Sequence, residues 1–413
     1  MSDTSWIIGA QLSTSHTALE LLPAERVEAI IDAALNHVPL KIIVVGAREA
    51  PQIFSTVCEM SRKHGYQSYL WYNLLSDVKG CDVAELVVDW RGQPSTGWGT
   101  WNGDDGAAEE TFKFICPNNP SARAKTLGQL EYLVTRYPFD GVFLDKCRFP
   151  SPANGMTELF SCFCTHCHRA AALRGLDLHE VAAMLNGGFL ADQLRADGSA
   201  IPAEASWNDR LIAGSSLLDR FMKFRADCVT GLIIEARKLT QRLGRVLALD
   251  LFTAGLAPIV GQDYTALSRL SSWMKPMTYR KALGPASLRL EIPALVDGLS
   301  KFTNSPIAMI ESWAARNIPT FAEGTLGTIR DDGVPVPLIA AEIAAAVRQM
   351  RGTPVYAGIE TLSYPGVIDV DAPMVRQLVR AAHSSGASGV IASWDLVYTP
   401  EENLLALRGD ARR

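Results

Sequence analysis

The chain has 413 residues, of which 48% are hydrophobic, and carries a formal net charge of -5. A chain of this size can bury a large core, and it is long for one domain unless that domain is an α/β barrel. The charge argues against nucleic acid and anionic membranes as partners, and no apolar run reaches membrane-spanning length. Residues 1–6 lack a basic segment followed by an apolar one, so we expect no secretory signal. Eight cysteines then favour a reducing compartment, and we expect a cytoplasmic protein.

Short apolar segments alternate along the chain with stretches of helical periodicity. The segments predict eight strands, over residues 6–9, 41–45, 69–74, 142–145, 246–252, 273–280, 354–360 and 389–395. Strands that alternate with helices are typical of parallel βαβ units, and eight such units predict a closed (β/α)8 TIM barrel. The alternative is an open doubly wound sheet, but the residues after the first strand contain no glycine-rich phosphate loop.

The connections between these predicted strands differ widely in length. Long βα-loop insertions are expected after strands 3, 4 and 6, on the face where barrel enzymes carry their active sites. The longest of them is an inserted segment at about residues 150–213, rich in Ala, Gly and Asp. Composition does not shift elsewhere, so we expect a single barrel domain over residues 1–413.

Four of the last five predicted strands end in an acid. These acids are Asp145, Asp250, Glu360 and Asp395. Any one of them alone would be explained as a helix cap or an ion-pair partner of a nearby Lys or Arg. In a barrel, however, all four would point into one mouth, and two carboxyl groups on either side of one bond are what glycoside hydrolysis requires.

Aromatic residues accompany the acids. Trp71, Tyr279 and Trp394 lie at strand ends, and a polar loop after strand 3 contains Trp98 and Trp101. The loop tryptophans either pack the loop onto the barrel or form a platform for a ligand with apolar faces, such as a sugar ring. The aromatic residues therefore favour a carbohydrate ligand.

Three motifs in this order resemble those of a known group. The segment Asp140-Gly141-Val142-Phe143-Leu144-Asp145 resembles the strand 4 signature of chitinase-like glycoside hydrolases and of related glycosyl hydrolase-like barrels. Met-Thr-Tyr at 277–279 resembles the Met-x-Tyr of strand 6 in the chitinase-like group, and residues 389–394 resemble its final strand, whose Trp floors the sugar site. The resemblance implies a barrel hydrolase that acts on carbohydrate.

The sequence departs from the chitinase-like pattern at three positions. Cys147 stands where that group has its proton-donating Glu, Phe143 replaces the intermediate Asp, and Arg280 replaces the Asp after the strand 6 Tyr. Substrate-assisted cleavage of N-acetyl sugars is therefore not expected. The chain is more similar to the glycosyl hydrolase-like branch, in which the strand 4 Asp can itself be catalytic.

By analogy with α-glycosidase barrels, the resemblance implies that Asp145 is the nucleophile or base. Glu360 is our first choice for the acid and Asp250 the second, and Tyr279 could hydrogen-bond the nucleophile. The substrate-binding candidates are Trp71, Asn73, Trp98, Trp101, Lys146, Arg148, Lys275, Tyr279, Arg280, Trp394 and Asp395.

The cysteines form a second signal. Cys162-x-Cys164-x-x-Cys167 has metal-ligand spacing, and His166, His168 or Cys147 could supply a fourth ligand. A structural zinc ion there would fasten the loop after Asp145, whereas the alternative is three reduced thiols at a helix start. The other cysteines, among them Cys116, are expected to be packed in the core. Catalysis itself is expected to require no cofactor.

The leading hypothesis is a glycosidase of carbohydrate metabolism that acts on an oligosaccharide or a glycoside. Whether the chain forms a homo-oligomer is left open. A second hypothesis is a carbohydrate-binding barrel without activity, because Cys147 replaces the expected Glu. A third is a lyase or isomerase that acts on a sugar acid and uses Lys146 or Lys275 as its base.

Overall fold

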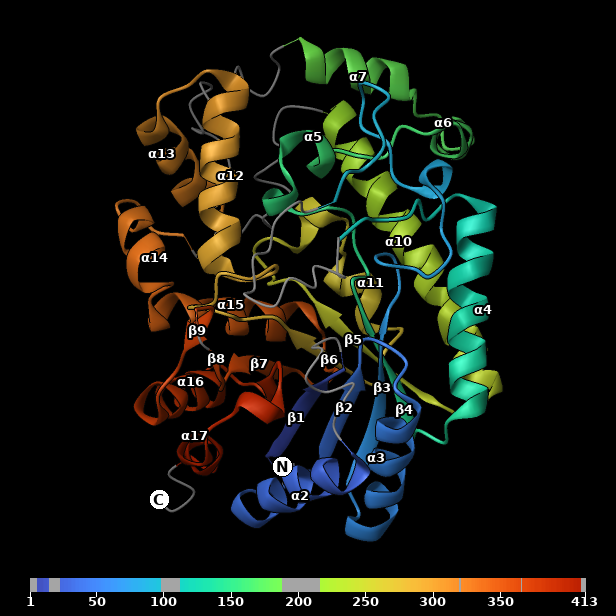
Figure 1. Cartoon of the computed structure of the whole chain (residues 1–413). Coiled ribbons are helices and arrows are strands. Elements are labelled where there is room, and N and C mark those ends of the chain that lie inside the picture. The colour runs from blue at the N-terminus through green and yellow to red at the C-terminus, as the bar shows by residue number, and fades with distance from the viewer. Residues whose placement is uncertain are drawn as a thin grey trace.

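The computed structural model describes residues 6–14, 23–97, 112–187, 216–318, 321–364 and 366–409. Eight parallel strands form one sheet in the order β6-β5-β4-β3-β2-β1-β10-β7. They are β1 (Ile7–Ser13), β2 (Ile42–Gly46), β3 (Gln67–Asn73), β4 (Gly141–Asp145), β5 (Val246–Leu251), β6 (Trp273–Pro276), β7 (Tyr356–Glu360) and β10 (Gly389–Ser393). Parallel bridges from Met274 to Val355 and from Met277 to Gly358 join β6 to β7. The predicted (β/α)8 TIM barrel is therefore confirmed (Figure 1).

Helices follow the strands and cover the outside of the barrel. Those between or after successive strands are α2 (Ala24–His37), α3 (Pro51–His64), α4 (Pro120–Arg136), α10 (Ser216–Arg242), α11 (Tyr264–Ser268), α15 (Val336–Gln349), α16 (Ala372–Ser384) and α17 (Glu401–Ala406). Helix α4 begins with Asn119 as its N-cap and Pro120 in the first turn, and both residue types are common at these positions of helices. None of the described helices is long and apolar enough to cross a membrane.

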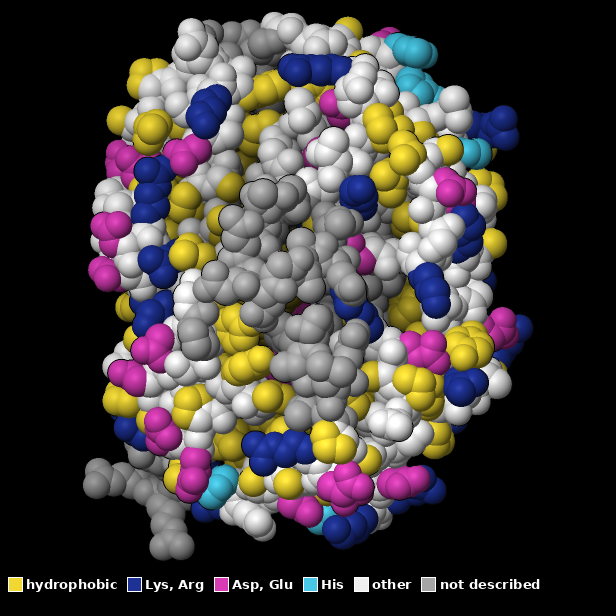
Figure 2. All heavy atoms as spheres, in the orientation of Figure 1, with side chains coloured by type: hydrophobic (Ala, Val, Ile, Leu, Met, Phe, Trp, Pro, Cys, Tyr) yellow, Lys and Arg dark blue, Asp and Glu magenta, His cyan; other side chains and the backbone are white. Residues whose placement is uncertain are grey.

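Further helices gather at one end of the barrel (Figure 1). The connection from β4 to β5 contains α5 (Met156–Leu159), α6 (Thr165–Ala172) and α7 (Leu178–Asn186), and that from β6 to β7 contains α12 (Leu288–Thr303), α13 (Ile307–Asn317) and α14 (Leu326–Asp332). A two-stranded hairpin, β8 (Ser363–Tyr364) with β9 (Ile368–Asp369), follows β7. Figure 2 shows acidic and basic side chains interspersed over the described parts of one face, rather than gathered by sign.

The core has two layers because every strand is covered on both sides. Phe143 points into the barrel, where it stacks on Trp273 with ring centroids 5.2 Å apart. Its neighbours Val142 and Leu144 belong to the larger cluster between sheet and helices. Side chains alternate across a strand, so a short continuous apolar run serves both layers at once. The apolar run that ends at Asp145 is explained by this double burial.

Glycine is required where neighbouring strands approach most closely. A Cβ atom on Gly389 would lie 2.1 Å from the carbonyl oxygen of Ile7, across the seam between β1 and β10. Because the clashing atom belongs to the backbone of a central strand, it cannot move without disturbing the strand pairing.

Gly389→Ala is therefore expected to lower the free energy of unfolding by about 2 kcal/mol or more, as measured by urea denaturation. Gly128→Ala is the matched control, because a Cβ atom on this helical glycine of α4 would meet no atom within 4 Å, and alanine there should stabilise slightly. Equal stability of Gly389→Ala and the wild type would contradict the close strand approach.

Candidate active site

A cavity opens at the carboxyl ends of the barrel strands. Its walls come from predicted site residues on β3, β4, β5 and the segments after β4 and β6, together with the tryptophan after β10 and several loop residues. The lining residues are Ser13, Trp71, Asn73, Phe112, Asp145, Lys146, Arg148, Asp250, Met277, Tyr279, Gly284, Pro285, Ala286 and Trp394. The position matches the face on which α/β barrels carry their active sites.

Asp145 ends β4 and lines the cavity with both carboxylate oxygens engaged. Trp71 Nε1 donates to Oδ2 at 2.9 Å, and the backbone N–H of Lys146 donates to Oδ1. Strand register explains the first contact, because Trp71 lies on β3, which pairs with β4. Both oxygens of Asp145 thus accept N–H groups, which fixes the position of its side chain.

Asp250 on β5 lies in a very different environment. Its residue is 1% exposed, and Lys275 Nζ donates to Oδ2 at 2.8 Å. Its other oxygen, Oδ1, has no hydrogen-bond partner among the described residues. Burial raises the pKa of Asp250 from 3.8 to about 8, and the charge of Asp145 adds to this effect while Lys275 opposes it. Asp250 is therefore a carboxyl group that holds its proton near neutral pH.

Lys275 is the hub of the polar groups below the cavity. Its ammonium group is 0% exposed and donates to Asp250, to Gln11 Oε1 at 2.7 Å and to the Tyr279 hydroxyl at 2.8 Å. Three donors of an ammonium group thus meet three acceptors. Gly358 on β7 leaves the space for it, because a Cβ there would lie 2.8 Å from Lys275 Cε.

Aromatic rings and unpaired polar atoms complete the cavity. Trp71, Tyr279 and Trp394 all line it, and the rings of Tyr279 and Trp394 lie 5.7 Å apart. Asn73 Oδ1, in the lining, is buried without a partner in the described part of the chain, whereas Gln11 Nε2, which also lacks one, lies outside the lining. Buried polar atoms that lack partners are costly, so the position of Asn73 is suited to a ligand that supplies a hydroxyl group.

Two predicted cationic residues line the wall of the cavity. Lys146 forms an ion pair with Asp77 at 2.8 Å and lies over the ring of Phe112 at 4.0 Å. Arg148 is 3% exposed, and its guanidinium lies between the rings of Phe114 and Phe252 at 4.7 and 4.5 Å. Burial lowers the pKa of Arg148 to about 10, so the group stays cationic near neutral pH.

Glu360, our first choice for the acid, does not line the cavity. Its carboxylate accepts backbone N–H groups of Arg280 at 2.9 Å, Lys281 at 3.0 Å and Ala282 at 2.6 Å. These contacts also explain why β6 ends at Pro276 rather than near 280, since the following backbone turns toward Glu360. Glu360 therefore shapes the loop after β6.

Other predicted site residues also lie away from the cavity. The Arg280 side chain donates to the carbonyl oxygens of Val334 and Asp332, and Asp395 accepts the backbone N–H of Val397 at 3.2 Å. Trp98 and Trp101 lie outside the described residues. Of the predicted substrate-binding residues, the structure thus brings together Trp71, Asn73, Lys146, Arg148, Tyr279 and Trp394, with Lys275 behind Asp250.

The structure also adds residues that the sequence analysis missed. Gln11 and Ser13 had a detectable signal, because they are polar and occupy alternate positions of a strand that is otherwise apolar. Phe112, Met277 and the loop residues 284–286 had none, since only the fold brings them to the cavity. Cys147, at the position of the missing Glu, is 0% exposed and does not line the cavity, and burial raises the pKa of its thiol well above the ordinary value.

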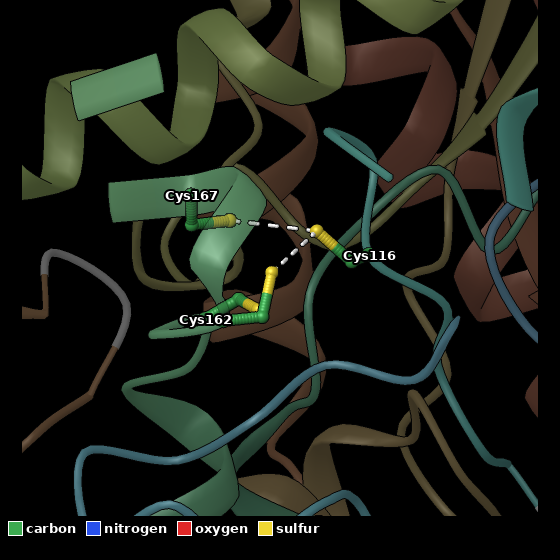
Figure 3. Close-up of side chains that lie close together, drawn as sticks. Cys116, Cys162 and Cys167 are labelled. Atoms are coloured by element: carbon green, nitrogen blue, oxygen red, sulfur yellow. Dashed lines mark hydrogen bonds between the residues drawn. The ribbon is translucent and has the colours of Figure 1, made fainter. Parts of the chain in front are cut away.

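A fourth cysteine, Cys116, lies beside the three cysteines of the predicted motif. The sulfur atoms of Cys116, Cys162, Cys164 and Cys167 all lie within 4.8 Å of one another, and Figure 3 shows three of these side chains converging. Cys116 is buried in the core as predicted, and the segment before α4 also brings its sulfur to the motif, which the sequence did not indicate. His166, His168 and Cys147 do not belong to this cluster.

Comparison with known proteins places the fold among glycoside hydrolase-like barrels. No protein family model and no curated protein sequence matches the chain. The glycoside hydrolase domain of PgaB (BpsB) from Bordetella bronchiseptica has a TM-score of 0.57 and 12% identity over 97% of this chain and 98% of that chain. A class V chitinase from Pseudomonas fluorescens Pf-5 has a TM-score of 0.49 and 9% identity over 99% of this chain and 100% of that chain. The first of these two similarities confirms the predicted resemblance to glycoside hydrolase-like barrels, at the level of the fold alone.

The raised pKa of Asp250 predicts a pH-dependent stability. In the unfolded chain Asp250 loses its proton near pH 3.8, whereas in the folded protein it keeps the proton up to about pH 8. The stability that this bound proton contributes is therefore lost as the pH rises through that interval. Asp250→Asn mimics the protonated acid and lacks this loss. The free energies of unfolding of the two proteins, from urea denaturation, should shift relative to each other by about 1 kcal/mol or more between pH 5 and pH 8, in favour of the variant. A constant difference would contradict a proton held on Asp250.

The contacts of Glu360 predict a structural defect when its charge is removed. Glu360→Gln places an amide nitrogen among three N–H donors and should lower the free energy of unfolding by about 1–3 kcal/mol. Glu402→Gln, on the exposed face of α17, is the control and should change little. A variant as stable as the wild type would restore Glu360 as a candidate acid.

Proposed function

We propose that the chain is a glycoside hydrolase in which Asp250 is the general acid and Asp145 is the nucleophile or base. One observation carries the proposal. Two carboxyl groups from adjacent strands line one cavity in opposite environments, Asp145 with N–H donors on both oxygens and Asp250 with its pKa raised by burial. Two carboxyl groups whose surroundings differ in this way fit the acid and base roles of glycosidases.

The proposed reaction breaks the bond between the anomeric carbon and the leaving oxygen. The proton of Asp250 passes to that oxygen, which departs with the bonding electron pair as an alcohol. Asp145 either attacks the anomeric carbon directly or removes a proton from the water that does so, and the water supplies the new hydroxyl group. Lys275, 2.8 Å from Asp250 Oδ2, stabilises the carboxylate that forms when the proton leaves.

The remaining lining residues suit a sugar ring. The rings of Trp71, Tyr279 and Trp394 offer faces for its C–H surfaces, and Asn73 Oδ1 can accept a hydroxyl proton. The lyase or isomerase reading has less support, because it needs a neutral amine as base. Both amines are already engaged by protein groups, Lys146 by Asp77 and Lys275 by Asp250, Gln11 and Tyr279, and neither is placed to take a proton from a substrate.

The test is release of new reducing ends from a panel of α- and β-linked aryl glycosides and oligosaccharides. Asp145→Asn should lower kcat by about 10²–10⁴-fold on every substrate that the wild type cleaves. Asp250→Asn should lower kcat as strongly on oligosaccharides but far less on aryl glycosides with acidic leaving groups, because these leave without a proton. The alkaline limb of the wild-type rate should fall near pH 8, where Asp250 loses its proton.

Asp331→Asn, an exposed position on α14, is the matched control and should retain wild-type turnover. Full activity of Asp145→Asn would remove Asp145 from the mechanism. Oligosaccharide binding without turnover in the wild type, over the whole panel, would instead favour the binding barrel and contradict the enzyme.

A further inference from the structure

We propose that Cys116, Cys162, Cys164 and Cys167 bind one zinc ion in a closed, structural tetrathiolate site. The proposal does not depend on the proposed enzymatic function. It rests on the spacing of the four sulfur atoms, on the donors that surround them and on a buried cation beside them. Each of these observations is independent of the cavity chemistry.

The spacing fits a single metal ion. A tetrahedral zinc ion with Zn–S bonds of about 2.3 Å holds its sulfurs ~3.8 Å apart. Here Cys116 Sγ lies 3.4 Å from both Cys164 Sγ and Cys167 Sγ, and all four sulfurs lie within 4.8 Å of one another. A disulfide would require about 2.05 Å. An iron–sulfur cluster would hold its cysteines farther apart, because iron and sulfide lie between them.

The surroundings stabilise negative charge on the sulfurs. The backbone N–H of Val88 donates to Cys162 Sγ at 3.3 Å, and that of Asn118 donates to Cys116 Sγ at 3.3 Å. The Asn118 side chain donates to Cys167 Sγ at 3.2 Å. Three N–H groups directed at sulfur are the outer contacts expected of metal-bound thiolates, which act only as acceptors.

A buried cation balances that charge. Arg225 on α10 is 0% exposed, and its guanidinium donates to the carbonyl oxygens of Leu159 at 2.6 Å, Ser161 at 2.8 Å and Ile259 at 2.7 Å. It forms no salt bridge with any acidic side chain in the described ranges. A buried charge is costly without a counter-charge, and four thiolates around one zinc ion carry a net charge of about -2 close to the Ser161 carbonyl.

The burial of the ligands indicates a structural role. Cys116, Cys162 and Cys167 are 0–1% exposed and Cys164 is partly buried, and four sulfur ligands fill a tetrahedral site, which leaves no open coordination position for water or substrate. His168, which directly follows Cys167, lies instead against His179, with tilted rings whose centroids are 4.4 Å apart. The site is thus complete with sulfur ligands alone.

The position of the site links it to the cavity wall. Cys116 belongs to the connection from β3 to β4, whereas the other three ligands belong to the connection from β4 to β5. Metal binding would fasten these two segments together. The first segment also carries Phe112 and Phe114, which lie over the charged ends of Lys146 and Arg148. Zinc would therefore hold one wall of the cavity in place.

The test begins with metal analysis of the full chain, purified without added metal or chelator. We expect one zinc per chain, and the cobalt-substituted protein should show the intense thiolate charge-transfer and tetrahedral d–d bands of a four-sulfur site. Removal of the metal with a chelator should lower Tm, and zinc alone should restore it.

Cys116→Ser and Cys164→Ser should each reduce the bound zinc to well below one per chain. Cys58→Ser is the matched control, a buried thiol in α3 outside the cluster, and should retain one zinc. If the ligand variants do not fold, the metal content and cobalt spectrum of the wild type still decide the matter. Metal-free protein whose Tm is unchanged by zinc, a disulfide within the cluster, or one iron in place of zinc would each overturn the proposal.

Discussion

The architecture of the candidate site depends on one buried hydrogen bond, from the ammonium group of Lys275 on β6 to the carboxyl group of Asp250 on β5. Both residues are 0–2% exposed at their side chains, and the Nζ–Oδ2 distance is 2.8 Å. Removing one partner of such a buried contact costs about 1–3 kcal/mol, because the other group is left without its hydrogen-bond partner. The neighbours follow from this constraint. Gln11 and Tyr279 take the other two protons of the ammonium group, and position 358 must be glycine to leave room for the lysine stem.

The same contact distinguishes the two carboxyl groups of the cavity. Asp145 stands one strand away at the carboxyl end of β4, where Trp71 and a backbone N–H hold it as an acceptor. Asp250 is buried beside it and keeps one oxygen without a partner among the described residues. Two acids of the same type thus lie in different surroundings, one with N–H donors on both oxygens and one whose pKa is raised by burial.

The barrel could be predicted because its signal is repeated and local. Eight apolar runs, each ending near a turn or a charge, alternate with amphipathic helices, and each run is covered on both faces. The site was predicted only in part, because four strands end in acids and their sequence positions look equivalent. The structure distinguishes them by what their carboxylates contact. Glu360 and Asp395 bind backbone N–H groups of nearby turns, whereas Asp145 and Asp250 line the cavity.

The cysteine cluster, too, could be predicted from local sequence patterns only in part. Cys162, Cys164 and Cys167 could be recognised from their spacing, since they lie on one short segment. Cys116 lies 46 residues before Cys162 and joins them only because the connections after β3 and β4 meet. Long-range contacts of this kind are set by the barrel topology, which the spacing of residues along the chain does not contain.

The measurement that tests the central claim most directly is an infrared titration of the carboxylic-acid carbonyl band, taken as the difference between wild type and Asp250→Asn. The account predicts a protonated-carboxyl band in the wild type at pH 6 that is missing from the variant and disappears near pH 8. A difference spectrum without that band at pH 6 would mean that Asp250 is already ionised. In that case Asp250 could not serve as the proton donor of the site.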